Sequence, residues 1–435
     1  MTRHVRTHPR SRMLASVAAF ALVVATASGA AVAFLGPTDP AASVTAQDAE
    51  LVSPAPAATT PTPSPTRTPE PDADFTIVAA GDVLPHLPVD ADARTTTGYD
   101  FSSLLSPMDP WIAGADLAIC HLEVPLAPAG TKPSGYPVFA APAQLAQDLK
   151  EQGWDGCSTS SNHSVDRGFA GVTSTLDALD AAGLGHVGTA RTETEAAQPQ
   201  LYRLERAGQT ITVAQIAAAF GTNGMPVEST KPWSVDLIDV PAMVREAKQA
   251  RADGADLVIA SVHCCVEYRT EPSVEQQAID QELADSGQFD LVIGHHAHVP
   301  QPVAKLEGGP DGDGMWVAYG LGNYLSNQDS ACCVANTDSG ILLTAHVTSP
   351  AASGEHPAGP ARVTSVEWTP ITVDRLGGHE VHALTDITDG TAHLSATKVT
   401  ERVARVTAAA GDEAPERTSP VIPTGPEPTV VPRTS

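Results

Sequence analysis

The stretch FDLVIGHHAH, residues 289–298, places an apolar run directly before three histidines. Its centre, Leu291–Ile293, has the branched apolar composition of a buried strand, and Gly294 ends the run. His295, His296 and His298 follow within four positions, in a chain with only 15 histidines among 435 residues. A His-x-His motif at a strand end is typical of a metal site. This interpretation gains weight if other strands end in the same way.

Four further apolar runs end in side chains that bind metals. They are FTIVAAGDV (75–83) with Asp82, ADLAICHLEVP (115–125) with His121 and Glu123, WDGCSTSSNHSVDRG (154–168) with Asn162 and His163, and ADLVIASVHCC (255–265) with His263. Each has an ordinary alternative when taken alone: Gly-Asp forms turns, Asn caps helices, and a lone His packs in a core. Turn preference does not explain ligand-type side chains at five strand ends out of five.

Helical patterns alternate with these runs. Residues 171–183, 240–256 and 273–287 have helical spacing, and the first places Val172, Leu176 and Leu179 on one face before Gly183. Alternation of strand and helix predicts a largely parallel sheet covered by helices, with the site beyond the carboxyl ends of the strands. Residues distant in sequence then converge there.

The converging side chains offer carboxylate, imidazole and carboxamide donors. This set suits divalent ions such as Mn, Zn or Fe. More than four such ligands indicate two ions, which lie about 3.5–4 Å apart in bridged sites. No Cys-x-x-Cys spacing supports a cysteine-based site instead.

Charge and composition limit the classes of partner. Hydrophobic residues make up 42% of the chain and aromatic residues 4%, so the core is built mainly from Ala, Val, Leu and Ile. The formal net charge is −26, with 51 acidic and 25 basic residues. Such a surface repels nucleic acid and anionic lipid, and we expect no nucleic-acid partner. An anionic substrate needs a locally positive site, which bound metal supplies.

The two ends of the chain differ from its middle. Four arginines precede the uncharged residues 13–35, so residues 1–35 are expected to be either an uncleaved membrane anchor or a cleaved export signal. Either outcome makes the protein exported. Residues 36–72 are rich in Pro and Thr and predict a disordered linker, and residues 411–435 predict a disordered tail. The folded domain is then 73–410.

The six cysteines permit disulfides in an exported protein. They are Cys120, Cys157 and the adjacent pairs Cys264–Cys265 and Cys332–Cys333. Six thiols allow 15 connectivities, and the sequence does not choose among them.

Seven segments together resemble the CapA-like capsule-synthesis proteins, which are associated with poly-γ-glutamate capsules. They are AAGDV (79–83), HLEVPL (121–126), YPVFAAP (136–142), SNHSVDRGFAGVTSTLDAL (161–179), VHCCVEY (262–268), IGHHAHVPQPV (293–303) and YGLGNYL (319–325). The resemblance covers about 75–375. It implies a calcineurin-like metallophosphoesterase architecture: an α/β, four-layer αββα sandwich of two mixed sheets packed face to face with helices outside.

The resemblance also implies roles for individual residues. The implied metal ligands are Asp82, Glu123, Asn162, His263, His296 and His298, with Asp82 as a candidate bridge between two ions. His163 matches the histidine that protonates the leaving group or steadies a phosphoryl oxygen. Asp166, assigned with it to catalysis, matches a family position of less certain role, as do Glu267, Tyr268 and Asn323, which would orient the ligands.

Some positions depart from the family pattern. Leu84 stands where phosphoesterases of this fold have the His of Asp-x-His, with His86 two residues further, and His121 stands where the family has Asn. Cys264–Cys265 replaces an aromatic-Gly pair. Our hypothesis is that a disulfide joins this pair to Cys332–Cys333 and stiffens a loop at the site.

Three classes of function follow from these observations. The first is a metal-dependent hydrolase or transferase outside the cytoplasm, acting on an anionic polymer or a phosphoester. The second is a non-catalytic factor that guides a growing anionic polymer beside membrane-embedded synthesis subunits. The third, a structural or lectin-like surface protein, leaves the strand-end ligands unexplained.

Overall fold

The computed structural model describes residues 71–353 and 357–434. The expected anchor or signal of residues 1–35, and nearly all of the expected linker, lie outside these residues. Within the described ranges, none of the helices combines the length and apolar character that a membrane crossing needs.

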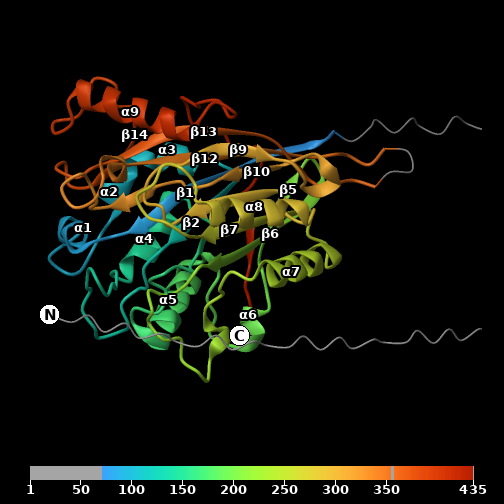
Figure 1. Ribbon diagram of the computed structural model, residues 1–435, viewed down its shortest axis with the longest axis horizontal. Helices are drawn as coiled ribbons and strands as arrows, with labels where there is room; N and C mark the ends of the chain where they lie inside the picture. The colour runs from blue at the N-terminus through green and yellow to red at the C-terminus, as the bar shows by residue number, and fades with distance from the viewer. Residues whose placement is uncertain (1–70, 354–356, 435) are drawn as a thin grey trace, which may run out of the picture. The chain divides into compact units, whose positions relative to one another are not determined.

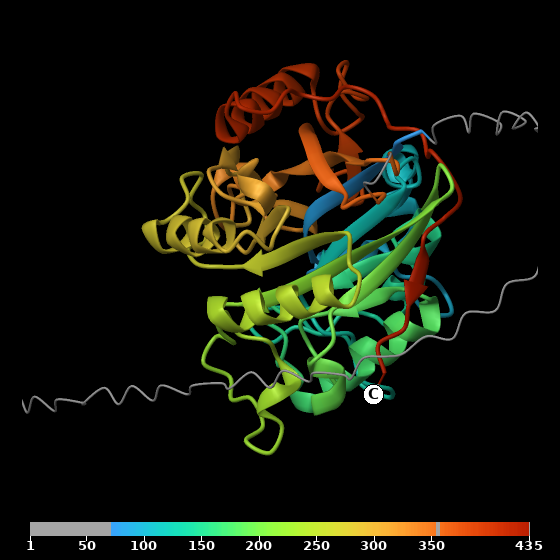
Figure 2. The same ribbon diagram turned by 90° about the vertical axis from the view of Figure 1, so that its right-hand side faces the viewer.

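Two mixed sheets form the centre of the domain (Figures 1 and 2). The first has the order β14-β13-β12-β1-β2-β3-β4, with β11 paired to β1, and the second has the order β15-β5-β6-β7-β8-β10-β9. The first contains β1 (Ala73–Leu84), β2 (Leu117–Leu122), β3 (Gly156–Ser158), β4 (Gly185–Val187), β11 (Asn323–Ser326), β12 (Ser339–Ser349), β13 (Arg362–Asp374) and β14 (Glu380–Ala383). The second contains β5 (Gln200–Arg206), β6 (Gln209–Ala219), β7 (Leu257–His263), β8 (Leu291–His295), β9 (Val303–Leu306), β10 (Met315–Ala318) and β15 (Thr429–Val431).

Each sheet has a parallel centre and antiparallel margins. Strands β1 to β4 run parallel, and β12, β13 and β14 extend that sheet in antiparallel fashion. Strands β6, β7, β8 and β10 run parallel, with β5 and β9 antiparallel at their sides. The expected pair of mixed sheets is therefore confirmed.

The helices lie between the strands in sequence and cover the sheets in space. They are α1 (Leu87–Asp92), α2 (Ser102–Leu105), α3 (Asp109–Ile112), α4 (Gln144–Gln152), α5 (Gly168–Ala182), α6 (Glu193–Ala196), α7 (Val240–Ala252), α8 (Val274–Asp285) and α9 (Ala396–Ala410). Short 3₁₀ turns occupy Ser106–Met108, Pro232–Ser234, Pro310–Gly312 and Ala335–Asp338. The three helical patterns of the sequence are α5, α7 and α8, and α9 packs against β12 and β13.

Apolar side chains form three main clusters that match these layers. Alternate residues of β1 point to opposite faces, so Ile77 joins the core between the sheets while Val78 joins the core beneath α4 and α5. In the second sheet, Ile259 faces the core between the sheets, and Val258 faces α7 and α8. Each parallel strand is buried on both faces, which explains the continuous apolar runs in the sequence.

The segment after α9 differs from the expected disordered tail. Thr429–Val431 forms β15, which pairs antiparallel with β5, and Figure 2 shows this red strand beside the green one. Arg433 is buried, and the Lys305 backbone N–H donates to Glu413 Oε2. The Pro- and Thr-rich composition suggested no packing partner, but this segment finds partners far away in sequence, so the boundary at 410 is corrected.

The cysteine hypothesis is also corrected. Disulfides join Cys264 to Cys265 and Cys332 to Cys333, each within its own pair, rather than linking the two pairs. A third joins Cys120 to Cys157, which face each other in register on β2 and β3. Because β2 and β3 are adjacent parallel strands, the Cα atoms of Cys120 and Cys157 lie 4.4 Å apart, which is within reach of a disulfide.

Candidate metal centre

Two groups of three buried ligand-type side chains meet where the two sheets face each other. Asp82, His121 and His263 form the first triad, and Glu123, His296 and His298 form the second. Within each triad, one donor atom from every residue lies within 4.8 Å of the others. In both triads, one sheet supplies the carboxylate and the other at least one imidazole. The site therefore depends on how the sheets pack.

Strand register brings these residues side by side. Asp82 of β1 stands opposite His121 of β2, and His263 of β7 stands opposite His295 of β8. Because the strands are parallel, their carboxyl ends reach the same edge of each sheet. The convergence expected from the strand ends is therefore present.

Two glycines allow a third segment to lie between the strand ends. A Cβ on Gly81 would come within 1.9 Å of the Gly322 carbonyl oxygen, and one on Gly294 within 1.9 Å of the Tyr319 carbonyl oxygen. The Asp82 backbone N–H donates to Gly322 O at 2.9 Å. Segment 319–322 thus packs against β1 and β8 at once and fixes their ends relative to each other.

The histidine cluster has an unusual backbone. His296 has φ +82° and His298 has φ +56°, a region that residues with a Cβ rarely occupy. Such strain persists only where the surroundings impose it, and it concentrates at functional sites. Here it turns both side chains of the His-x-His motif towards Glu123.

Several donor atoms of the site have no hydrogen-bond partner among the described residues. Both carboxylate oxygens of Glu123 are buried and unpaired, as are Nδ1 of His295 and Nδ1 of His296. Buried polar atoms are nearly always paired, so this cluster needs an explanation. Unpaired carboxylate and imidazole donors are what a divalent cation satisfies, and the residues therefore fit metal ions.

The electrostatics of the first triad favour the ligand forms of its groups. Burial raises the pKa of Asp82, but the neighbouring imidazoles of His295 and His298 outweigh burial and hold that pKa well below its usual range. Burial, reinforced by neighbouring histidines, holds the pKa values of His121 and His263 well below the usual range. Metal binding requires an ionised carboxylate and neutral imidazoles, and these three groups have that form.

In the second triad, the imidazole of His298 offsets the negative charge of the neighbouring carboxylates. Burial lowers the pKa of His298, but Glu123 and Asp82 outweigh burial and raise that pKa to about 10. His298 Nδ1 lies 3.0 Å from Asp82 Oδ2, and its Nε2 lies 3.7 Å from Glu123 Oε1. The carboxyl groups of Asp82 and Glu123 therefore share one cationic neighbour, His298. A divalent ion would balance the negative charge that remains.

A chain of contacts holds the ligands in place. Ser158 Oγ contacts His121 Nδ1 at 2.8 Å, and His121 Nε2 lies 2.9 Å from His263 Nδ1. Asn162 Oδ1 lies 2.9 Å from His263 Nε2, which places the predicted Asn against the first triad. Asn323 Oδ1 lies 3.1 Å from His298 Nδ1 and orients that ring.

A cavity of about 860 Å³ reaches the second triad at His298. His163, Asp166 and His298 line it together with an apolar wall that includes Phe139 and Met225. His163 Nδ1 lies 2.7 Å from Asp166 Oδ2, which also accepts the Phe139 backbone N–H at 2.6 Å. No lysine or arginine is among the described residues that line the cavity.

The predicted site residues are largely brought together. Asp82, Glu123, His263, His296 and His298 lie in the two triads, and Asn162 adjoins them. His163 and Asp166 form a pair in the cavity, where Glu267 and Tyr268 also line the wall. Their roles as ligands and catalytic groups stay predictions. His86 lines the same cavity, outside both triads.

Two strand-end histidines of the site are absent from the ligand set that the resemblance implies. His121 belongs to the first triad; it was named among the strand-end side chains, but the ligand set implied by the resemblance leaves it out because the family has Asn at this position. His295 stacks on His121, with ring centroids 4.0 Å apart, and its Nδ1 lies 3.6 Å from Asp82 Oδ1. The signal was present in both cases, because each histidine stands at a strand end beside a residue that was chosen.

A known protein family matches this chain. The model of the family described as "Bacterial capsule synthesis protein PGA_cap" matches residues 76–328, which is more than half of the chain. The chain belongs to this family. The match includes most of β1, both triads and the His163–Asp166 pair, so the segments that carried the resemblance lie inside it.

Two curated relatives share part of this region. The chain is 27% identical to PGA biosynthesis protein CapA of Bacillus subtilis (strain 168) over 183 residues, covering 41% of this chain and 44% of that protein. It is 28% identical over 234 residues to a probable polyglutamine synthesis accessory protein of Mycobacterium tuberculosis (strain CDC 1551 / Oshkosh), covering 51% and 56%. The chain thus spans about half the length of the curated relatives it matches.

Several solved structures have a similar course of the chain. They include the calcineurin-like phosphoesterase YfkN from Bacillus subtilis (14% identity, 77% of this chain and 97% of that chain, TM-score 0.45) and the NAD nucleotidase of Haemophilus influenzae (11% identity, 77% and 62%, TM-score 0.43). Likenesses at these TM-scores add nothing to the chemistry, which follows from the residues described above.

Proposed function

We propose that this PGA_cap family member is a metal-dependent hydrolase that acts on a phosphoester or γ-glutamyl bond during synthesis of a capsule or other cell-envelope polymer. The observation that carries the proposal is the pair of buried triads beside one cavity of about 860 Å³ that also contains the His163–Asp166 pair. The direction towards polymer synthesis comes from the family and from the names of the relatives.

Two divalent ions, of Mn, Zn or Fe type, suit the donor set. Asp82, His121 and His263 would hold one, with Asn162 adjoining, and Glu123, His296 and His298 would hold the other. Bound there, the ions would polarise a phosphoryl or acyl oxygen and offset negative charge on the substrate. This matters because the described cavity wall has no lysine or arginine, in a chain of net charge −26.

The chain's own residues supply proton transfer and positioning. Asp166 accepts from His163 Nδ1 at 2.7 Å and thereby fixes the ring, which leaves Nε2 as the nitrogen that exchanges a proton with the substrate. Since the backbone N–H of Phe139 holds Asp166 in turn, the pair is oriented before substrate arrives. His163 then donates a proton to the leaving oxygen or nitrogen as a general acid. The apolar wall beside it limits the access of water.

A second candidate is a factor that binds a growing anionic polymer without cleaving it. The described cavity wall offers no fixed cation besides histidine, so binding of such a polymer would also depend on metal ions. The accessory role in the name of the mycobacterial relatives favours this option. The domain would act beside membrane-embedded synthesis subunits, outside the cytoplasm, either anchored by residues 1–35 or released after cleavage.

The test is metal content paired with turnover in the purified protein. We expect two equivalents of divalent metal, together with hydrolysis of bis(p-nitrophenyl) phosphate or of a γ-glutamyl peptide that is lost in His296→Ala. Metal without turnover of either compound supports the binding factor. Absence of metal after reconstitution with Mn, Zn and Fe contradicts both candidates.

A further inference from the structure

A second cavity, of about 460 Å³, lies on the other face of the second sheet. Strand β5 supplies Leu201 and Arg203 to its wall, while the alternating residues Tyr202 and Leu204 are buried in the core between the sheets. Helix α7 and the end of β15 form the other walls. This cavity shares no lining residue with the one that reaches the second triad. Its volume is in the usual range for sites that bind small molecules, roughly 300–1,000 Å³.

Three arginines surround this cavity in a protein with an excess of acidic residues. They are Arg203 of β5, Arg245 of α7 and Arg433, which follows β15. Arg203 and Arg245 are exposed at the rim, and neither has a salt-bridge partner in the part of the chain that the structure describes. With 25 basic residues against 51 acidic ones, three arginines around one hollow concentrate positive charge where a ligand can enter.

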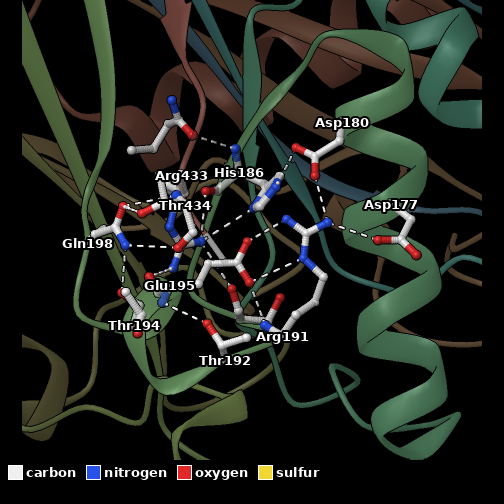
Figure 3. Close-up of polar contacts among 12 residues, drawn as sticks. Asp177, Asp180, His186, Arg191, Thr192, Thr194, Glu195, Gln198, Arg433 and Thr434 are labelled. Carbon is white, nitrogen blue, oxygen red and sulfur yellow. Dashed lines mark hydrogen bonds and ion pairs between the residues drawn. The ribbon is translucent and has the colours of Figure 1, made fainter.

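Arg433 is held rigidly at the inner end of the cavity. Its guanidinium donates to the carbonyl oxygens of His186 at 3.0 Å, Thr189 at 3.1 Å and Glu195 at 2.5 Å (Figure 3). The Glu195 carboxylate itself pairs with Arg191. Arg433 is 7% exposed, and its Nε is buried without a partner among the described residues. The unpaired Nε–H remains a donor for an anionic group, and the guanidinium charge acts on the nearby carboxylates of Glu195, Asp236 and Glu246.

Helix α7 presents an acidic group beside these arginines. One face of the helix and its C-terminal end line the cavity with four side chains: Arg245, Glu246, Gln249 and Asp253. Burial raises the pKa of Glu246 to about 7, although Arg433 lowers it, because no hydrogen bond to the carboxylate compensates for its desolvation among the described residues. Asp253 accepts from Gln249 at 3.0 Å and is exposed at the rim. Positive and negative groups therefore stand on neighbouring parts of one wall.

We propose that this cavity binds a small zwitterion, such as an amino acid or short peptide with free ends, whose carboxylate contacts the arginines and whose ammonium contacts Glu246. Leu201, Val431 and the methyl group of Ala250 give the apolar contact that an aliphatic frame needs between its charged ends. The site lies outside the proposed metal centre and does not depend on turnover there. Its ligand is bound rather than cleaved.

The test measures binding of three probes to the full chain by calorimetry. L-alanyl-L-alanine carries both charges, its N-acetyl derivative carries only the carboxylate, and its amide carries only the ammonium. We expect the free dipeptide to bind at least tenfold more tightly than either capped form. Arg203→Ala combined with Arg245→Ala, both at exposed positions, should weaken binding at least tenfold. Lys248→Ala, an exposed position on α7 outside the cavity, is the matched control and should leave binding unchanged.

Glu246→Gln separates the two charges of the ligand. In this variant the free dipeptide and its N-acetyl form should bind equally, because the partner of the ammonium is gone. The proposal is overturned if the free dipeptide does not bind at millimolar concentration. It is also overturned if the N-acetyl form binds as well as the free dipeptide to the natural chain, or if the double arginine variant binds as the natural chain does.

Discussion

Nε2 of His121 lies 2.9 Å from Nδ1 of His263, although the two residues are 142 positions apart and belong to different sheets. Each ring also contacts a further polar group, Ser158 for His121 and Asn162 for His263. Burial and the neighbouring histidines hold both pKa values well below the usual range, so the rings are neutral. Two neutral imidazoles are thus held beside Asp82, and a cation bound there would replace the contact between their ring nitrogens.

The first prediction concerns the division of ligands between two ions. His263→Ala should remove one equivalent of metal and His296→Ala the other, because these residues belong to different triads. Each variant should retain the remaining ion. Elemental analysis of the purified variants measures this directly. His393→Ala, at an exposed position outside both triads, should keep two equivalents. Loss of both ions in each single variant would instead mean that the triads form one inseparable site.

The second prediction concerns the His163–Asp166 pair. His163→Ala should lower kcat by about 10²–10⁴-fold with unchanged metal content, because a positioned general acid contributes a factor of this size. The loss should be smaller for an ester with a p-nitrophenol leaving group than for one with an alkyl alcohol, since the better leaving group needs less protonation. Asp166→Asn should lower kcat for the alkyl ester with little change in KM. An equal loss for both leaving groups would exclude the general-acid role.

The sequence predicted the position of the site better than its internal arrangement. The apolar runs before Asp82, His263 and His296 identify strand ends, because a buried parallel strand must be apolar on both faces. The division into two triads depends on how one sheet packs on the other. That packing involves contacts such as the one between Asp82 and His296, 214 positions apart, which periodicity does not encode. His121 stands at such a strand end as well, but the ligand set implied by the resemblance omits it, because the family has Asn at this position.

The C-terminal segment is ordered although its sequence predicts disorder. Its composition predicts disorder, because Pro and Thr cannot build a core alone. Its structure comes from groups supplied by the rest of the domain: the edge of β5 pairs with β15, and three carbonyl oxygens accept from Arg433. Nothing in the sequence around Arg433 indicates that this residue anchors the segment to the rest of the domain.

The third prediction is a pH-dependent gain in stability for Asp280→Asn. Asp280 of α8 is 2% exposed, its Oδ1 has no partner among the described residues, and burial raises its pKa to about 8. The unfolded chain releases this proton near pH 4, whereas the folded chain keeps it until about pH 8. Stability is therefore fully present below about pH 4 and falls as the pH rises to about 8.

The asparagine does not ionise, so its advantage over aspartate should grow across that window. We expect similar unfolding free energies at pH 4 and a gain of at least about 1 kcal/mol for the variant at pH 8. Urea unfolding at several pH values measures the difference. A gap that is the same at every pH would mean that Asp280 is ionised in the folded chain.

The fourth prediction concerns Asp116, which joins three distant parts of the domain. Its Oδ1 accepts from Arg206 Nη2 at 2.8 Å and from the Thr424 backbone N–H at 2.6 Å, and its Oδ2 accepts from the Thr76 backbone N–H at 2.8 Å. Asp116 and Arg206 are 1% and 3% exposed. Removing one partner of a buried pair leaves the other charge uncompensated, so Asp116→Ala should destabilise the fold by about 3–5 kcal/mol.

The pairing can be separated from the loss of the side chain. Asp116→Ala combined with Arg206→Met removes both charges, and this double variant should be more stable than Asp116→Ala alone, since no unpaired guanidinium remains buried. Asp389→Ala, at an exposed position without an ion-pair partner among the described residues, should change the unfolding free energy by less than about 0.5 kcal/mol. If the double variant is as unstable as the sum of its two single variants, the two residues stabilise the fold independently, and the ion pair between the sheets contributes nothing of its own.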